Sequence, residues 1–196
     1  MHALVAIITK GKPTENVIDN LMSPYDESLE IDFNDEDEYW YNPRGMWDWY
    51  NICRWDAKKF ENDGSRYGSE PPFTEIAVKV SDLLDNAKKV IELDVTEEDY
   101  PEDYQTWQKM TERMIAGEEQ YYSKEYCLEH YPKFTDYMLA KKDLAFYSVL
   151  VDGEWTDVGS GMIFDKGCQT EDILEFIKKY LEPNRDCWIT VVNYHF

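Results

Sequence analysis

The chain has few basic residues for its length. Its 196 residues contain 20 lysines and arginines against 41 aspartates and glutamates, which gives a formal net charge of −21 and a pI of about 4.4. Direct binding to nucleic acid or to an anionic membrane surface is therefore disfavoured, because such affinity comes from lysine and arginine neutralising phosphates. Two interpretations remain. Either the acidic residues only confer solubility, or they are displayed to a basic partner and imitate a phosphate backbone.

Long hydrophobic runs are also missing. No window approaches the roughly 18 consecutive apolar residues that a membrane span needs. The first residues, MHALVAIITKGK, have no basic leader and no cleavage site after them, so they are typical of a strand rather than of a signal peptide. We therefore predict a cytoplasmic protein.

Cysteine and the common catalytic motifs are scarce. The four cysteines stand at long, irregular intervals without a C-x-x-C pair, which predicts free thiols rather than a disulfide framework. Only Cys127 and His130 have ligand-like spacing, and a zinc site would need a second such pair. No phosphate-binding loop, calcium loop or nucleophile elbow is present. We expect neither a metal nor a cofactor, and we assign no catalytic residue.

Hydrophobic and aromatic residues, by contrast, are plentiful, at 43% and 15% of the chain. They suffice for one core, and we predict a single domain over residues 1–196. Apolar β-rich runs at 3–9, 144–159 and 187–196 alternate with amphipathic helices at 15–22 and 171–181. This β-α-β-β-α-β order predicts an α+β fold with a ferredoxin-like antiparallel sheet. The predicted core is 1–24 and 143–196, with a long, mostly helical acidic insertion at 25–142.

The insertion contains several helix signals. Asn42 and Pro43 predict a helix start, because apolar residues recur after them at helical spacing as far as Phe60. Further helices are predicted after Thr74, over 102–130 and over 133–142. Outside the insertion, Asp152-Gly153 predicts a hairpin turn and Thr170 a helix cap.

Two acidic runs give the main functional signal. Residues 26–38 contain eight acids and no base, and residues 92–103 contain seven acids. On the displayed-acid interpretation these runs bind a partner, and exposed aromatic side chains add contact area. The predicted partner-binding residues are Asp26, Glu27, Glu30, Asp32, Asp35, Glu36, Asp37, Glu38, Trp40, Glu97, Glu98, Asp99, Glu102 and Asp103.

An alternative hypothesis about the functional site starts from the tryptophans. Trp47, Arg54, Trp55 and His195 have the residue types for base stacking and phosphate pairing, and they predict a pocket if they converge. If the first and last strands are neighbours, their ends place His2 and His195 in one region, and a histidine pair near Trp55 or Arg54 would be a candidate acid–base site. The plainer interpretation of both histidines is an isolated position at a chain end.

Four segments resemble the motifs of a known group of proteins. SPYDE, YNPRGMWDWYNICRW, VDGEW and VVNYHF occur in the same order as in an uncharacterised bacteriophage-encoded family, whose members carry Y-N-P-x-x-x-W-D-W-Y-x-I-G-G-R-W and end near V-D-C-H-I. Cys53 stands in place of the Gly-Gly pair, and Asn193-Tyr194 in place of Asp-Cys. If the family's site is catalytic and built there, this chain has lost part of it. The resemblance implies a phage origin and no established activity.

These observations lead to one favoured function. We predict a phage accessory protein that acts in the host cytoplasm and inhibits a defence or nucleic-acid-processing complex, in the manner of an anti-CRISPR protein. Nucleases and RNA-guided effectors present basic channels that an acidic surface would fit. The alternative is a small nucleotide-modifying or hydrolytic enzyme using the tryptophan pocket, and we favour it less. The aromatic-rich helical region would also support a homodimer.

Overall fold

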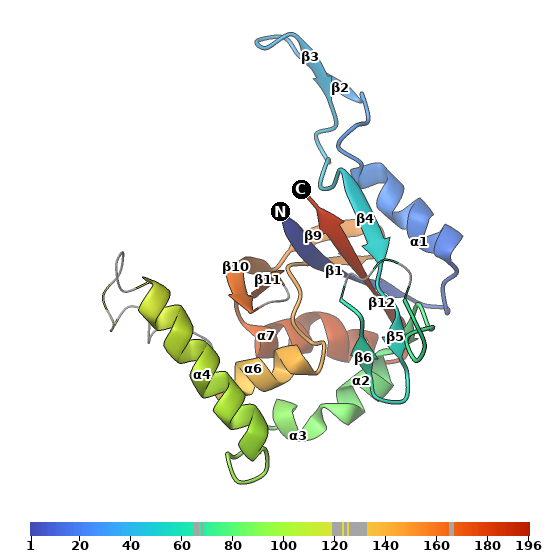
Figure 1. Ribbon diagram of the computed structural model, residues 1–196. Helices are drawn as coiled ribbons and strands as arrows, with labels where there is room; N and C mark the ends of the chain where they lie inside the picture. The colour runs from blue at the N-terminus through green and yellow to red at the C-terminus, as the bar shows by residue number, and fades with distance from the viewer. Residues whose placement is uncertain (65–66, 68, 119–122, 124, 126–132, 165–166) are drawn as a thin grey trace.

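A mixed β-sheet forms the centre of the molecule (Figure 1). The computed structural model describes residues 1–64, 67, 69–118, 123, 125, 133–164 and 167–196. Within them, eight strands share the main sheet. They are β1 (His2–Thr9), β4 (Trp49–Ile52), β7 (Val78–Lys79), β8 (Ser148–Val151), β9 (Glu154–Asp157), β10 (Gly159–Phe164), β11 (Gly167–Thr170) and β12 (Trp188–His195).

Two small hairpins and a set of helices surround this sheet. The hairpins are β2 (Asp32–Asn34) with β3 (Tyr39–Tyr41), and β5 (Trp55–Asp56) with β6 (Glu61–Asn62). The helices are α1 (Glu15–Met22), α2 (Val80–Asn86), α3 (Lys88–Ile91), α4 (Pro101–Glu118), α6 (Phe134–Lys141) and α7 (Ile173–Phe176), with the short turns η1 (Ser23–Tyr25), η2 (Ile177–Leu181) and η3 (Glu182–Asn184). The prediction of an α+β chain is confirmed. None of the described helices combines the length and the apolarity that crossing a bilayer requires.

The first and last strands form the axis of the sheet. They pair antiparallel along their whole length, from His2 opposite His195 to Thr9 opposite Trp188. On its other edge, β1 pairs in parallel with β8, while β4 and β7 pair with the free edge of β12. Residues 3–8 are all buried because the sheet is covered on both faces, which explains why this strand has an unbroken apolar sequence.

The strand order differs from the predicted ferredoxin-like order. In a split β-α-β unit, another strand separates the two strands that a helix connects. Here β1 and β8 are direct neighbours, from Val5 opposite Ser148 to Ile8 opposite Val151, and β9 lies outside β8. The sheet is therefore mixed rather than antiparallel. The long segment between β1 and β8 allows the crossover that a parallel pair needs.

Helices cover the two faces of the sheet unequally. Leu4, Ala6 and Ile8 of β1 belong to a large core cluster with residues of α2, α3, α6 and α7. The alternating residues Val5 and Ile7 belong to a smaller cluster on the opposite face, where α1 packs. The period of two along β1 thus assigns each residue to one of the two helix layers.

The first half of the insertion, as far as it is described, consists of strands and turns rather than α-helices. The described residues between 25 and 79 form strands, turns and the end of the 3₁₀ turn η1, so the predicted helix after Pro43 is wrong. Instead of capping a helix, the Asn42 side chain donates hydrogen bonds to two backbone carbonyls. Residues 49–52 form a strand that pairs with β12. The predicted helices appear only afterwards. Most of the predicted continuation of α4 to residue 130 lies outside the described residues, which include only Ser123 and Glu125 there.

The hairpin and the helix near the C-terminus follow the prediction more closely. Asp152 and Gly153 both have positive φ, at 52° and 80°, as the predicted turn between β8 and β9 requires. Asp172, rather than Thr170, caps α7, because its carboxylate accepts from the Glu175 N–H at 2.9 Å. The buried Thr170 hydroxyl instead bonds both the N–H and the C=O of Phe146.

Candidate functional site

The segment 26–41, called the acidic arm from here on, projects away from the sheet as a two-stranded hairpin (Figure 1). Its strands pair from Asp32 opposite Tyr41 to Asn34 opposite Tyr39. At the tip, the Asn34 side chain accepts from the N–H groups of Glu36 and Asp37 at 2.9 and 3.3 Å, a local bond typical of asparagine in turns. The arm thus places eight acids without a base on a narrow ribbon.

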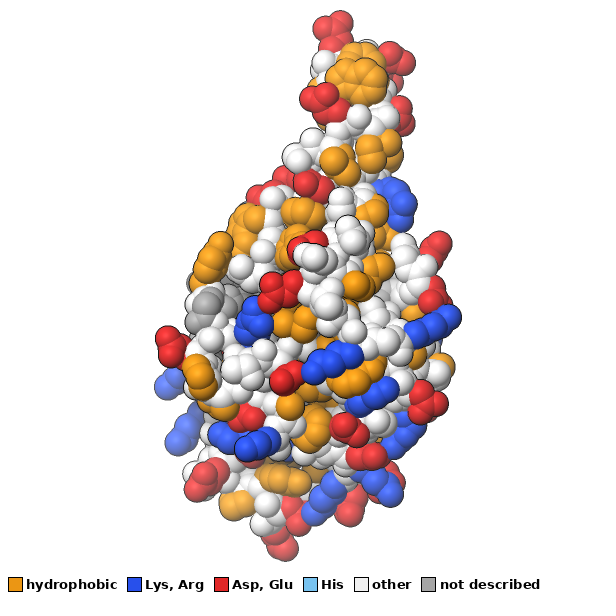
Figure 2. Space-filling view, turned by 90° about the vertical axis from the view of Figure 1, so that its right-hand side faces the viewer, with side chains coloured by type: hydrophobic (Ala, Val, Ile, Leu, Met, Phe, Trp, Pro, Cys, Tyr) orange, Lys and Arg blue, Asp and Glu red, His pale blue; other side chains and the backbone are white. Residues whose placement is uncertain are grey.

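Large apolar side chains on the arm are exposed together with these acids. Ile31 and Trp40 are each 56% exposed, and Tyr39 is 50% exposed. Phe33 and Trp40 pack against each other, with ring centroids 5.3 Å apart. On the face seen in Figure 2, hydrophobic and acidic side chains cover the arm, and Lys and Arg side chains appear only from its base downward. Exposed aromatic side chains of this kind are typical of binding hot spots.

The root of the arm is firmly held. The Asn42 amide donates to the carbonyls of Pro24 and Asp26 at 3.0 and 2.8 Å, and its oxygen accepts from the Arg44 N–H at 2.9 Å. The Tyr25 hydroxyl donates to the Gly153 carbonyl at 2.6 Å. These bonds tie both ends of the arm to the body and to the β8–β9 hairpin.

The second acidic run lies elsewhere on the molecule. It occupies the region of α3 and the start of α4, at the opposite end from the acidic arm (Figure 1). Two of its predicted binding residues pair with lysines, Asp99 with Lys89 at 2.7 Å and Asp103 with Lys141. The hydrogen bond from Lys89 holds the pKa of Asp99 below its ordinary value. The predicted acidic surface is therefore two separate patches, and the arm is the more strongly charged one.

The four residues of the predicted tryptophan pocket are not brought together. Trp47 packs on the α1 face, and its Nε1 donates to the Met22 carbonyl at 3.1 Å. Trp55 is fully buried on the opposite face. Arg54 pairs with Glu15 at 2.6 Å. His195, the fourth residue, lies at the end of β12.

His195 instead joins a group that we call the histidine cluster, made of His2, Asp48, Trp49, Asn193 and His195. The Nδ1 atom of His195 lies 2.8 Å from the Asp48 carboxylate. Partial loss of water acts to raise the pKa of Asp48, but the hydrogen bond and charge of His195 and a backbone bond at Trp49 outweigh it, so the pKa is lowered. His2 lies directly opposite His195, as expected for neighbouring first and last strands.

Sequence reasoning identified the two histidines but missed Asp48 and Trp49. Both were assigned to a helix, on which they would point in unrelated directions. Once residues 49–52 are read as a strand beside β12, Trp49 falls opposite His195, and Asp48 directly precedes it. The backbone N–H of Asp48 also donates to the His195 carbonyl at 3.1 Å.

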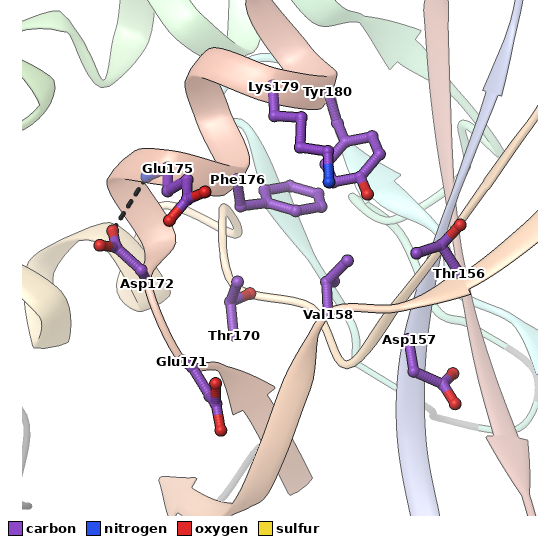
Figure 3. Close-up of a pocket in the computed structure, with 10 residues that line it drawn as sticks. All are labelled: Thr156, Asp157, Val158, Thr170, Glu171, Asp172, Glu175, Phe176, Lys179 and Tyr180. Carbon is purple, nitrogen blue, oxygen red and sulfur yellow. Dashed lines mark hydrogen bonds between the residues drawn. The ribbon is translucent and has the colours of Figure 1, made fainter.

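A separate cavity of about 240 Å³ lies between the end of β9 and the helix α7 (Figure 3). Several of its polar side chains already have structural partners. Asp157 accepts from the Ser148 hydroxyl and the Trp155 indole, and Asp172 caps α7. We therefore assign no function to this cavity.

The described part of the chain offers few clustered metal ligands. There, no group of three or more histidine, cysteine, aspartate or glutamate side chains has the arrangement to hold a metal ion. Cys127 and His130, the pair with ligand-like spacing, lie outside the described residues. Cys53 and Cys187 are thiols rather than members of a disulfide, and the Cys53 thiol donates to the Gly64 carbonyl.

Comparison with known proteins found no match for this chain among family models, curated proteins or solved structures.

Proposed function

We propose that this chain is a binding protein whose acidic arm docks onto a basic surface of a host protein or nucleoprotein complex. The observation that carries the proposal is the combination of eight acids, no base and exposed aromatic side chains on one projecting hairpin. In the biological setting that the motif resemblance suggests, the chain is a phage accessory protein. It inhibits a nuclease or an RNA-guided effector by competing with its nucleic acid.

Charge and shape both favour this kind of partner. A concentrated negative field speeds the encounter with a basic surface and excludes acidic partners. A two-stranded β-ribbon is narrow enough to lie in the major groove of a duplex, so it is also small enough to enter a channel that holds one. The arm is thus suited to occupy a nucleic-acid channel.

Solubility alone does not explain the arm. A solubilising segment needs charge but gains nothing from exposing Ile31, Tyr39 and Trp40, each at least half exposed. Such side chains promote association, and an arm that carries them usually has a partner that buries them. The acids provide the attraction at a distance, and the aromatic side chains provide the contact area.

The homodimer stays a prediction with less support. Its proposed interface was the aromatic-rich helical region, but Tyr104 and Trp107 of α4 pack against Phe134 of α6, with ring centroids 5.1 and 5.7 Å away. These rings contribute to contacts within the chain.

A pull-down from the lysate of a defence-carrying bacterial host tests the proposal. The tagged protein is immobilised at low salt and eluted with a salt gradient. We expect a basic nucleic-acid-handling protein to be released at moderate salt, because screening weakens exposed charge contacts. Added DNA or RNA should displace the same protein. Retention of no such protein at low salt would contradict the proposal for that host.

A further inference from the structure

One end of the main sheet presents polar side chains on a face that is otherwise apolar. His2 and Leu4 lie on the same face of β1, and so do Asn193 and Val191 on β12, because side chains alternate along a strand. Leu4 and Val191 are buried in the core cluster beneath the helices, whereas His2 is exposed. The helix layer therefore ends between Leu4 and His2, and the histidine cluster lies beyond it.

Both imidazoles in this cluster have one nitrogen fixed by an acceptor. The Nδ1 atom of His2 lies 3.0 Å from the amide oxygen of Asn193, and that of His195 lies 2.8 Å from the Asp48 carboxylate. An amide oxygen and an ionised carboxylate only accept, so each Nδ1 carries the proton. In each neutral ring Nε2 is then the basic nitrogen, and neither Nε2 is used in these two bonds.

The two rings are close enough to act on one substrate. Their centroids are 5.2 Å apart, and Trp49 contacts both, stacking on His195 at 5.6 Å and meeting His2 edge-on at 5.0 Å. The side chains of His195 and Asp48 are 34% and 39% exposed, and Trp49 is 40% exposed. The cluster is thus held in place by neighbours yet open to a ligand.

We propose that the histidine cluster is a general acid–base site that cleaves a short ribonucleotide phosphodiester. The Nε2 atom of His195 removes the proton from the substrate's 2′-hydroxyl, and the 2′-oxygen attacks phosphorus. The new O2′–P bond forms as the P–O5′ bond breaks, and the leaving 5′-oxygen takes the proton from Nε2 of protonated His2. The products are a 2′,3′-cyclic phosphate and a 5′-hydroxyl. Solvent then returns a proton to His2 and removes one from His195.

The composition of the cluster selects this substrate class. It contains no hydroxyl or thiol, so the nucleophile is either water or a group of the substrate, and a ribose 2′-hydroxyl already lies beside the phosphorus that it attacks. An acid and a base are the groups that such a transfer needs from the protein. Trp49 offers an aromatic surface for a nucleobase. The net charge of −21 repels long polyanions, which limits the substrate to short nucleotides.

The test is cleavage of the dinucleoside monophosphate UpA by the purified full chain, followed by chromatography of the products. We expect uridine 2′,3′-cyclic phosphate and adenosine, with a bell-shaped dependence of the rate on pH, because one imidazole must be neutral and the other protonated. His2→Gln and His195→Gln should each lower kcat by about 100-fold or more. Asp48→Asn should lower kcat with little change in KM, because Asp48 positions His195 and does not touch the substrate.

A matched aromatic control separates the site from general effects. Trp49→Ala should raise KM several-fold, whereas Tyr67→Ala, which removes an aromatic side chain that is 87% exposed, should change neither constant. Thermal unfolding of every variant verifies that it is folded. Absence of UpA cleavage by the wild-type chain would overturn the proposal. Cleavage that both histidine variants retain would also overturn it, because the activity would then belong to a contaminant. Neither result affects the acidic arm, which is tested by partner binding.

Discussion

Two buried threonines differ in what their hydroxyl groups do. The Thr170 hydroxyl accepts from the Phe146 N–H at 2.7 Å and donates to the Phe146 carbonyl at 2.6 Å. Thr190 on β12 is fully buried, and its hydroxyl has no hydrogen-bond partner in the described part of the molecule. The Thr170 hydroxyl forms hydrogen bonds with backbone groups of another segment. The Thr190 hydroxyl is buried without a hydrogen bond that would offset its loss of contact with water.

Replacing each threonine by valine should therefore change the free energy of unfolding by very different amounts. Thr170→Val leaves a buried N–H and a buried C=O without partners, and we expect the free energy of unfolding to fall by about 2–4 kcal/mol. Thr190→Val removes an unsatisfied polar group and should change the same free energy by less than about 0.5 kcal/mol or raise it. Urea unfolding of both variants measures the difference. Equal losses would contradict this assignment of the hydrogen bonds.

Tyr50 predicts a pH dependence at alkaline pH. Its hydroxyl donates to the Asp19 carboxylate at 2.5 Å, and burial together with that negative charge raises its pKa well above the ordinary value. Above a pH of about 10 the unfolded chain loses the tyrosine proton while the folded chain keeps it, so stability falls as pH rises. Tyr50→Phe should weaken this decline and cost about 1 kcal/mol at pH 8. Unfolding measurements from pH 8 to 11 test it, and an unchanged slope would contradict it.

At the scale of residues, the histidine cluster shows why a site cannot always be predicted from the sequence. His2 and His195 were identifiable as strand-end positions. Asp48 lies 147 positions from His195 in the sequence, and only the pairing of β4 with β12 brings them together. The spacing of residues that are close together in the sequence does not indicate that β4 pairs with β12.

At the scale of elements, segments with one dominant periodicity were predictable. The first strand, the helix at 15–22, the hairpin around Asp152-Gly153 and the last strand all appear near their predicted bounds. Residues 46–60 were not, because Met46, Trp49, Tyr50 and Cys53 fit a helical stripe as well as a strand. The free edge of β12 decided the outcome by pairing with residues 49–52.

The acidic arm gives a prediction about its root. The side chain of Asn42 makes three hydrogen bonds there, and the residue is only 7% exposed. Asn42→Ala should loosen the arm and raise amide hydrogen exchange of Ile31, whose N–H bonds the Tyr41 carbonyl, by about tenfold or more. Asn34→Ala removes an asparagine at the tip instead and should leave the root protected. Equal exchange of Ile31 in the two variants would show that Asn42 does not hold the arm.

At the scale of the whole molecule, composition predicted the acidity but not its distribution. The two acidic runs are 54 positions apart at their nearest residues, Glu38 and Glu92, and the fold places them at opposite ends of the body. The strand order could not be predicted from the sequence either, because the same element order is compatible with β1 beside either strand of the β8–β9 hairpin. Long-range pairing, rather than local pattern, decides both features.

The role of the acidic arm in binding is tested by comparing three baits in the host pull-down. They are the wild-type chain, an arm variant with four acids neutralised, and a control variant with the same number and kinds neutralised in the second acidic run. The arm variant carries Glu30→Gln, Asp35→Asn, Glu36→Gln and Glu38→Gln, and the control carries Asp94→Asn, Glu97→Gln, Glu98→Gln and Glu102→Gln. All eight side chains are exposed, so both variants should fold as the wild type does.

We expect the wild type and the control to retain the same basic nucleic-acid-handling protein to similar salt concentrations. The arm variant should release it at clearly lower salt or fail to retain it, because four of the eight charges that face the partner are gone. Retention by the arm variant equal to that of the wild type would contradict the claim that the acidic arm is the binding surface.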